Sequence, residues 1–124
     1  HCLAHQLGGY YQVPHGLANA IILPLVLKAL RPRVDVRLAR LSDHLQLTDK
    51  KAPRSEKAEA FITLVETMND KMKLTNNFGH LIKTSDIETL SNRAYKEGFP
   101  LYPVPELWEP IRYTAIYQLL QKEP

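Results

Sequence analysis

The apolar stretch from Leu17 to Ala29 constrains the fold of this chain most. It is apolar nearly all round and is interrupted mainly by Asn19 and Lys28. A helix with this pattern is typically buried rather than laid on a surface, so we expect a buried helix here. Pro24 lies inside the stretch, and we expect it to kink the helix or to end its first half.

Apolar residues recur at helical spacing along the rest of the chain. The stripes are Val34, Leu38, Leu41 and Leu45; Ala58, Phe61, Ile62, Val65, Met68 and Met72; Ile87, Leu90 and Ala94; and Ile111, Ala115 and Leu119. No segment alternates apolar and polar residues as a strand does. The sequence therefore predicts an all-α fold, a bundle of about five to six helices.

Local signals suggest where these helices begin and end. Ser55 is placed to cap one helix, and Ser85 begins a capping-box spacing for the next. Gly98 is expected to end that second helix. The proline-rich segment "FPLYPVPELWEP" predicts an irregular linker, with Pro110 in the first turn of a last helix.

Composition and length indicate one globular domain. The chain has 124 residues, of which 44% are hydrophobic and 23% charged, which is too apolar for disorder. Cys2 is the only cysteine, so a reducing compartment fits best and we expect a cytoplasmic protein. No apolar run reaches membrane-spanning length and no signal peptide is visible.

The formal charge of +3 is modest. Nucleic-acid binding requires basic residues gathered on one surface, and the best candidates are Arg33, Arg37 and Arg40, which share a helical face. The opposite face carries the Val34 stripe, so we favour a solvated outer face and expect no nucleic-acid partner.

Three histidines lie within the first sixteen residues. His1 and His5 are four apart, which places them on one helix face where two imidazoles can reach the same ion. The zinc-protease pattern needs a glutamate beside the first histidine, and Cys2 occupies that place. Gly8 and Gly9 are expected to end the short helix and turn the chain.

His15 follows Pro14 at the head of the next helix, so it can return towards the first. Neutral imidazole is a good ligand for Zn²⁺ and Fe²⁺. On the residues alone, a metal site and a set of hydrogen-bonded structural histidines both stay open. His44 and His80 lack such neighbours, and we expect them to be ordinary surface or core residues.

The longer segment "HCLAHQLGGYYQVPHGLANAIILPLV" carries many residues at fixed spacings. These are His1, His5, Leu7, Gly8, Pro14, His15, Gly16, Asn19, Ala20, Leu23, Pro24 and Val26. Together they resemble the pattern of the iron-containing (group III) alcohol dehydrogenase family, and the remaining helical pattern is similar to that family's all-helical C-terminal domain. Leu25 and Tyr102 depart from it, standing where a histidine and an asparagine are common.

The resemblance implies roles that spacing alone does not give. It implies that His1 and His15 are metal ligands for Fe²⁺ or Zn²⁺. It also implies that His5 lies beside the metal, near nicotinamide and substrate, as the catalytic and cofactor-binding residue. The implied activity is reversible hydride transfer between NAD(P)H and a small alcohol or aldehyde, with the metal as Lewis acid. Tyr10 and Tyr11 either line the pocket or pack against the core, and we favour packing.

The resemblance also shows what residues 1–124 lack. The family completes its metal site with an Asp-x-x-x-His pair, and no aspartate here is followed by histidine at that spacing. No glycine-rich nucleotide turn is present either. We therefore expect residues 1–124 to be a C-terminal metal- and substrate-binding domain, without its N-terminal nucleotide-binding half, and inactive alone. A homo-oligomer is left open.

Two other hypotheses remain. One is a non-enzymatic helical module, a truncated relative that keeps the fold and binds a partner. The other is a weak metal binder that uses His1, its terminal amine and His5. The metal content of the complete protein distinguishes the enzyme from the module, because only the enzyme requires an ion held by both His1 and His15.

Overall fold

The computed structural model describes residues 1–122, with the backbone alone at positions 99 and 100. Within this range the elements are α1 (Cys2–Tyr11), α2 (His15–Leu30), α3 (Asp35–His44), α4 (Arg54–Lys71), the 3₁₀ turn η1 (Gly79–Leu81), α5 (Thr84–Leu101) and α6 (Pro110–Lys122). No strand occurs in the described part of the chain. The predicted all-α fold of five to six helices is confirmed.

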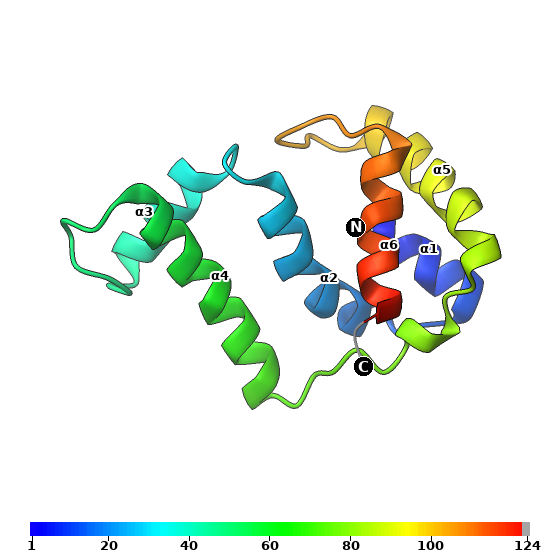
Figure 1. Cartoon of the computed structure of the whole chain (residues 1–124), viewed down its shortest axis with the longest axis horizontal. Helices are drawn as coiled ribbons and strands as arrows, with labels where there is room; N and C mark the ends of the chain where they lie inside the picture. The colour runs from blue at the N-terminus through cyan, green and yellow to red at the C-terminus, as the bar shows by residue number, and fades with distance from the viewer. Residues whose placement is uncertain (123–124) are drawn as a thin grey trace.

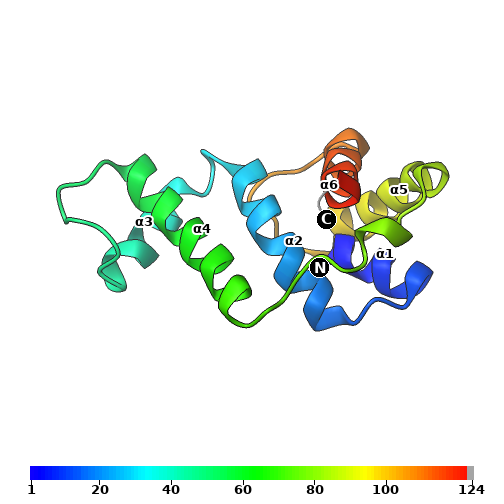
Figure 2. The same ribbon diagram turned by 60° about the horizontal axis from the view of Figure 1, so that its bottom comes forward.

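Helix α2 lies in the middle of the molecule. On one side α3 packs against α4, and on the other α1, α5 and α6 form a second group (Figures 1 and 2). Helix α2 contacts α1, α4 and α6 and so joins the two groups. Across residues 1–122, no helix is both long and apolar enough to cross a membrane.

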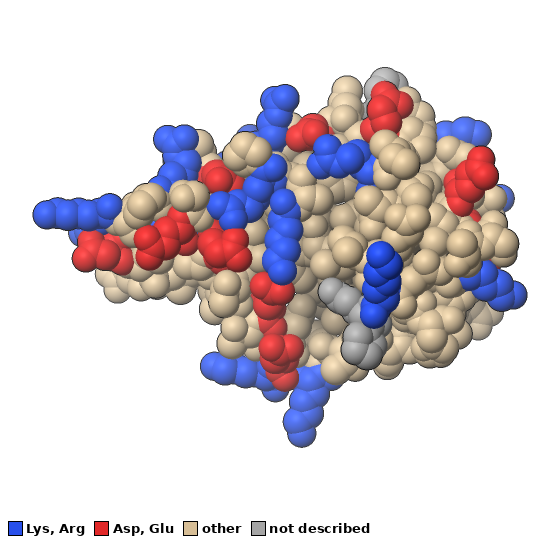
Figure 3. Space-filling model, viewed as in Figure 1, with Lys and Arg blue, Asp and Glu red and all other residues tan. Residues whose placement is uncertain are grey.

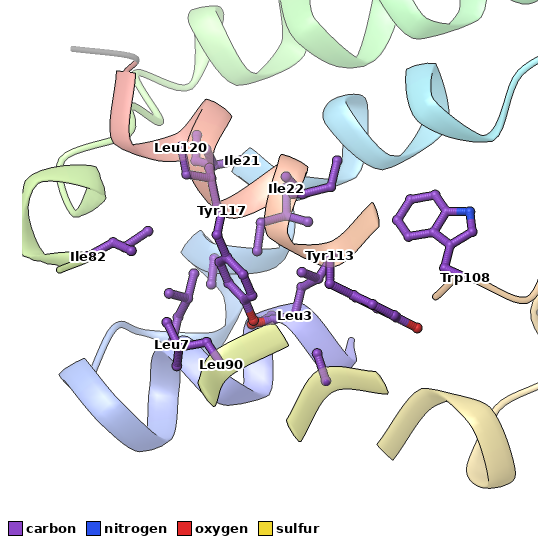
Figure 4. Close-up of a cluster of buried hydrophobic side chains, with 14 of the residues drawn as sticks. Leu3, Leu7, Ile21, Ile22, Ile82, Leu90, Trp108, Tyr113, Tyr117 and Leu120 are labelled. Carbon is purple, nitrogen blue, oxygen red and sulfur yellow. The ribbon is translucent and has the colours of Figure 1, made fainter. Parts of the chain in front are cut away.

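The main core lies between α1, α2, α5 and α6 (Figure 4). Leu7, Leu90 and Tyr117 are all completely buried there, and burial of a large apolar side chain contributes about 1.5–3 kcal/mol. The Tyr117 hydroxyl donates to the Leu3 carbonyl at 2.9 Å. This bond connects α6 directly to α1, the helix that carries His5.

Pro24 does not end the first half of α2, because the helix is continuous from His15 to Leu30. A proline has no N–H to offer the carbonyl four residues earlier, which here is that of Ala20. The side-chain amide of Asn69, on α4, donates to that carbonyl at 2.8 Å. The hydrogen bond that Pro24 cannot make is therefore replaced from a neighbouring helix.

Fewer apolar residues are buried than the apolar stripes predict. Helix α2 leaves Leu23 45% exposed, because α1, α4 and α6 cover only part of it. The far ends of the α3 and α4 stripes are also exposed, at Leu41, Leu45, Met68 and Met72. The predicted α6 stripe is wrong: Ile111, Ala115 and Leu119 are exposed, and the buried face is Tyr113, Ile116, Tyr117 and Leu120.

Several predicted helix ends are wrong as well. Ser55 and Ser85 lie inside the first turns of α4 and α5, and neither helix has a side-chain cap. Gly98 does not end α5, which continues to Leu101. Instead Gly98 permits close packing, since a Cβ there would lie 2.8 Å from the Tyr113 hydroxyl and 3.3 Å from Cys2 Sγ. Pro110 begins α6 as predicted.

The predicted arginine face is solvent-exposed, as Arg33, Arg37 and Arg40 all are. Arg33 lies 3.7 Å from a carboxylate oxygen of Glu106. Basic and acidic side chains are interspersed over α3 and α4 in Figure 3. The face shown therefore carries charges of both signs rather than a continuous basic surface.

Candidate metal centre

A tight turn between α1 and α2 brings the histidines together. Helix α1 runs through Gly8 and Gly9, which were predicted to end it, and ends at Tyr11 with Gln12 as its C-cap. Gln12 adopts the left-handed conformation (φ 56°), and its N–H bonds to the Gly8 carbonyl at 3.1 Å. Such a left-handed residue commonly closes a helix and redirects the chain. Pro14 then precedes α2, which begins at His15.

The three imidazoles form one cluster, which we call the histidine cluster (His1, His5 and His15). Each offers a ligand nitrogen, and these nitrogens all lie within 4.8 Å of one another. The ring centroid of His15 lies 5.3 Å from that of His1 and 5.2 Å from that of His5. All three residues are exposed, so the cluster opens to the surface.

Polar and aromatic neighbours hold two members of the cluster. The side-chain amide nitrogen of Asn19 lies 2.9 Å from Nε2 of His15, one helical turn away on α2. The Tyr102 ring stacks near His1, with centroids 6.4 Å apart and an interplanar angle of 25°.

Glu97 on α5 is a member of the site that the sequence analysis missed. Its carboxylate contacts Nδ1 of His5 and accepts hydrogen bonds from Gln6 at 2.9 Å and from Tyr102 at 3.1 Å. Partial burial raises the pKa of the Tyr102 hydroxyl, and its bond to Glu97 raises it further. One signal was available: Glu97 continues the buried Leu90–Ala94 stripe at helical spacing.

The donor set fits a divalent cation. Neutral imidazole nitrogens are good ligands for both Zn²⁺ and Fe²⁺. Within residues 1–122, this is the single group of three or more His, Cys, Asp or Glu side chains close enough to share an ion.

A small pocket of about 150 Å³ lies beside the cluster and is lined by His1, Cys2, Val26, Trp108 and Tyr113, among others. Burial raises the pKa of the Cys2 thiol. The Trp108 indole N–H is buried without a hydrogen-bond partner among the described residues. The pocket is mostly apolar, with a histidine at its edge.

The remaining residues considered from the sequence lie apart from the cluster. Tyr11 packs against the core, and its hydroxyl donates to Asp86 at 2.7 Å. Tyr10 is 38% exposed under the Arg93 guanidinium, which lies 5.2 Å from its ring centroid. His44 and His80 are exposed.

The fold and the cluster define an all-helical domain with a histidine-rich site at the junction of two helices. A family model for the C-terminal region of the Fe-containing alcohol dehydrogenase family matches residues 1–120. The chain belongs to this family. The resemblance of its opening segment to the family pattern is therefore confirmed.

Named relatives agree with this assignment. The chain is 32% identical over 117 residues to alcohol dehydrogenase 4 of Saccharomyces cerevisiae, covering 92% of this chain and 28% of that protein. It is 27% identical over 99 residues to 1,3-propanediol dehydrogenase of Citrobacter freundii, covering 79% of this chain and 26% of that protein. A crystal structure of 1,3-propanediol oxidoreductase superposes with a TM-score of 0.86 at 25% identity, over 97% of this chain and 31% of that one. The chain thus spans less than a third of these relatives.

Proposed function

We propose that residues 1–124 form the C-terminal metal- and substrate-binding domain of an NAD(P)-dependent alcohol dehydrogenase or aldehyde reductase. Membership of the Fe-containing family supports this, and so does the convergence of the three histidines on one surface. That convergence is the observation that carries the proposal. A cytoplasmic location is part of the proposal, and the single cysteine supports it.

In this proposal His1 and His15 are metal ligands for Fe²⁺ or Zn²⁺. His1 is the N-cap of α1 and His15 is the first residue of α2, so a shared ion would join the two helices. Such an ion supplies Lewis acidity for an alcohol or aldehyde oxygen, and NAD(P) held outside residues 1–124 supplies or accepts the hydride.

His5 is the proposed neighbour of the reacting atoms. It lies one helical turn from His1 and stacks against His15, at 5.2 Å between centroids. A nitrogen there is well placed to give or take the proton that accompanies alcohol oxidation. The pocket beside His1, with a volume of about 150 Å³ and a mostly apolar lining, suits a short alkyl chain.

Metal analysis of the complete protein tests the proposal. His1→Ala and His15→Ala are each expected to lose most of the bound metal and the NAD(P)-dependent alcohol turnover. His5→Gln keeps the metal and loses turnover. His44→Ala is the matched control, because His44 is exposed on α3 and far along the chain from the cluster.

Metal content that is the same in wild type, His1→Ala and His15→Ala would contradict the proposed ligands. A complete protein that holds no metal and turns over no alcohol would instead support the non-enzymatic helical module.

A further inference from the structure

The Glu97 carboxylate is surrounded by donors from two parts of the chain. Gln6 Nε2 donates to one carboxylate oxygen, and the Tyr102 hydroxyl donates to the other, which also contacts His5 Nδ1. Gln6 and His5 lie on α1, whereas Tyr102 follows α5. The carboxylate is therefore held in place independently of His5.

We propose that Glu97 is a positioning residue that holds His5 in a single orientation with the proton on Nδ1. The role of His5 in the reaction rests on the proposed function, but the contact between Glu97 and His5 does not. Neither the family pattern in the opening segment nor the spacing of the histidines includes this residue.

The tautomer follows from hydrogen-bonding chemistry. An ionised carboxylate can only accept, so the His5 nitrogen that faces it must carry the hydrogen. In a neutral imidazole the other nitrogen is then unprotonated. Glu97 thus leaves Nε2 as the one nitrogen of His5 that can accept a proton or meet a substrate.

The packing of α5 against α1 allows Glu97 to reach His5. The next residue, Gly98, is buried, and a Cβ there would lie 2.8 Å from the Tyr113 hydroxyl and 3.3 Å from Cys2 Sγ on α1. A larger residue would therefore meet the ends of the Tyr113 and Cys2 side chains, which would have to shift. Glu97 precedes this close contact between α5 and α1, and its carboxylate reaches the histidine cluster.

Stability alone does not explain the pair. The His5 side chain is 40% exposed and that of Glu97 20% exposed, and pairs at such exposure contribute little to folding. A carboxylate behind an imidazole fixes its tautomer and ring direction, which matters most where the imidazole takes part in chemistry.

Nitrogen-15 NMR spectra test the proposal directly, recorded on the complete protein without metal and with its histidines labelled. At about pH 8.5, where ordinary imidazoles are neutral, His5 is expected to show a protonated Nδ1 and an unprotonated Nε2. In Glu97→Leu, which removes the acceptor, His5 shifts towards the mixture of tautomers found in free histidine. Glu66→Leu is the matched control, since Glu66 pairs with Lys28 at 2.9 Å away from the cluster.

A wild-type spectrum with the proton on Nε2 would overturn the proposal, even if the Glu97→Leu variant failed to fold. So would a folded Glu97→Leu protein whose His5 tautomer is unchanged. These spectra need neither metal nor activity, so they decide the role of Glu97 whatever becomes of the proposed function.

A kinetic cycle adds a second readout. We expect Glu97→Leu to lower kcat about 10- to 100-fold while the metal content stays unchanged. The double variant Glu97→Leu/His5→Gln is expected to have a kcat no lower than that of His5→Gln alone. A double variant that multiplies the two losses would show that Glu97 does not act through His5. If His5→Gln leaves kcat intact, the proposed function of His5 fails, while the spectra still test the contact.

Discussion

Removal of the Asn69 side chain tests how α2 remains intact at Pro24. Asn69 donates to the Ala20 carbonyl at 2.8 Å, the acceptor that Pro24 cannot satisfy. Asn69→Ala leaves this partly buried carbonyl without its partner. Pro24→Ala restores a backbone N–H at the correct helical spacing, so Asn69→Ala is expected to cost less in that background.

The size of the stability loss follows from the single hydrogen bond that Asn69→Ala removes. A net hydrogen bond contributes about 1 kcal/mol, and a buried group left unsatisfied costs about 1–3 kcal/mol. Ala20 is only half-buried, so we expect Asn69→Ala to lower the free energy of unfolding by about 2 kcal/mol. In the Pro24→Ala background the loss falls by about 1 kcal/mol, which exceeds the roughly 0.3–0.5 kcal/mol scatter of independent sites.

Urea unfolding of the 124-residue chain, followed by far-ultraviolet circular dichroism, measures the free energy of unfolding of each protein in this cycle. These proteins are the wild type, Asn69→Ala, Pro24→Ala and the double variant. Asn92→Ala in the same two backgrounds is the control, because Asn92 is exposed on α5 and its effect should add to that of Pro24→Ala. Equal losses for Asn69→Ala with and without Pro24 would refute the reasoning.

Four further predictions concern packing, titration and activity. Gly79→Ala lowers the free energy of unfolding by about 2 kcal/mol in urea titrations, because its Cβ would lie 2.1 Å from the Leu120 carbonyl oxygen. A Cβ at Gly9 would have nothing within 4 Å, so Gly9→Ala raises the free energy of unfolding by about 0.5–1 kcal/mol. If both glycine variants lost stability, or if neither did, the contact at Gly79 would be contradicted. Burial raises the pKa of Tyr117, so the folded chain keeps a proton that the unfolded chain loses, and stability falls as pH rises above about 10. Tyr117→Phe flattens that decline in unfolding free energy, and an unchanged slope would disprove the assignment. Ser42→Ala removes a fully buried hydroxyl with no partner among residues 1–122, so thermal denaturation should show unchanged or slightly greater stability; a large loss would reveal a hidden partner. The 124-residue chain alone gives no NAD(P)H absorbance change with alcohols, because it lacks a glycine-rich nucleotide turn, and any such turnover would show that the domain is sufficient.

Local patterns were enough to predict the fold class. Apolar residues at 3.6-residue spacing marked α3, α4 and α5, since that spacing depends only on neighbours within a few turns. The same patterns overestimated burial. Leu23 and Met72 follow their stripes yet are 45% and 57% exposed, because burial depends on which helices pack nearby.

Pro24 shows why a local rule can fail. The rule that proline breaks a helix holds when the freed carbonyl finds no other donor. Asn69 supplies that donor from a position 49 residues away. No window of sequence around Pro24 contains this information.

The histidine cluster was partly predictable and partly not. His1, His5 and His15 were identified as candidates because two are one helical turn apart and the third follows a proline turn. Glu97 lies 92 residues from His5, so only the packing of α5 on α1 reveals it. The division of the histidines into ligands and reacting neighbour stays a prediction.

Anomalous diffraction from crystals of the complete protein tests the central claim most directly. With data collected at the iron and zinc absorption edges, the account predicts one peak about 2.1 Å from a nitrogen of both His1 and His15, with His5 outside the ligand set. A peak bound by His5 in place of His15, or no peak at the cluster in protein loaded with Fe²⁺ or Zn²⁺, would contradict it.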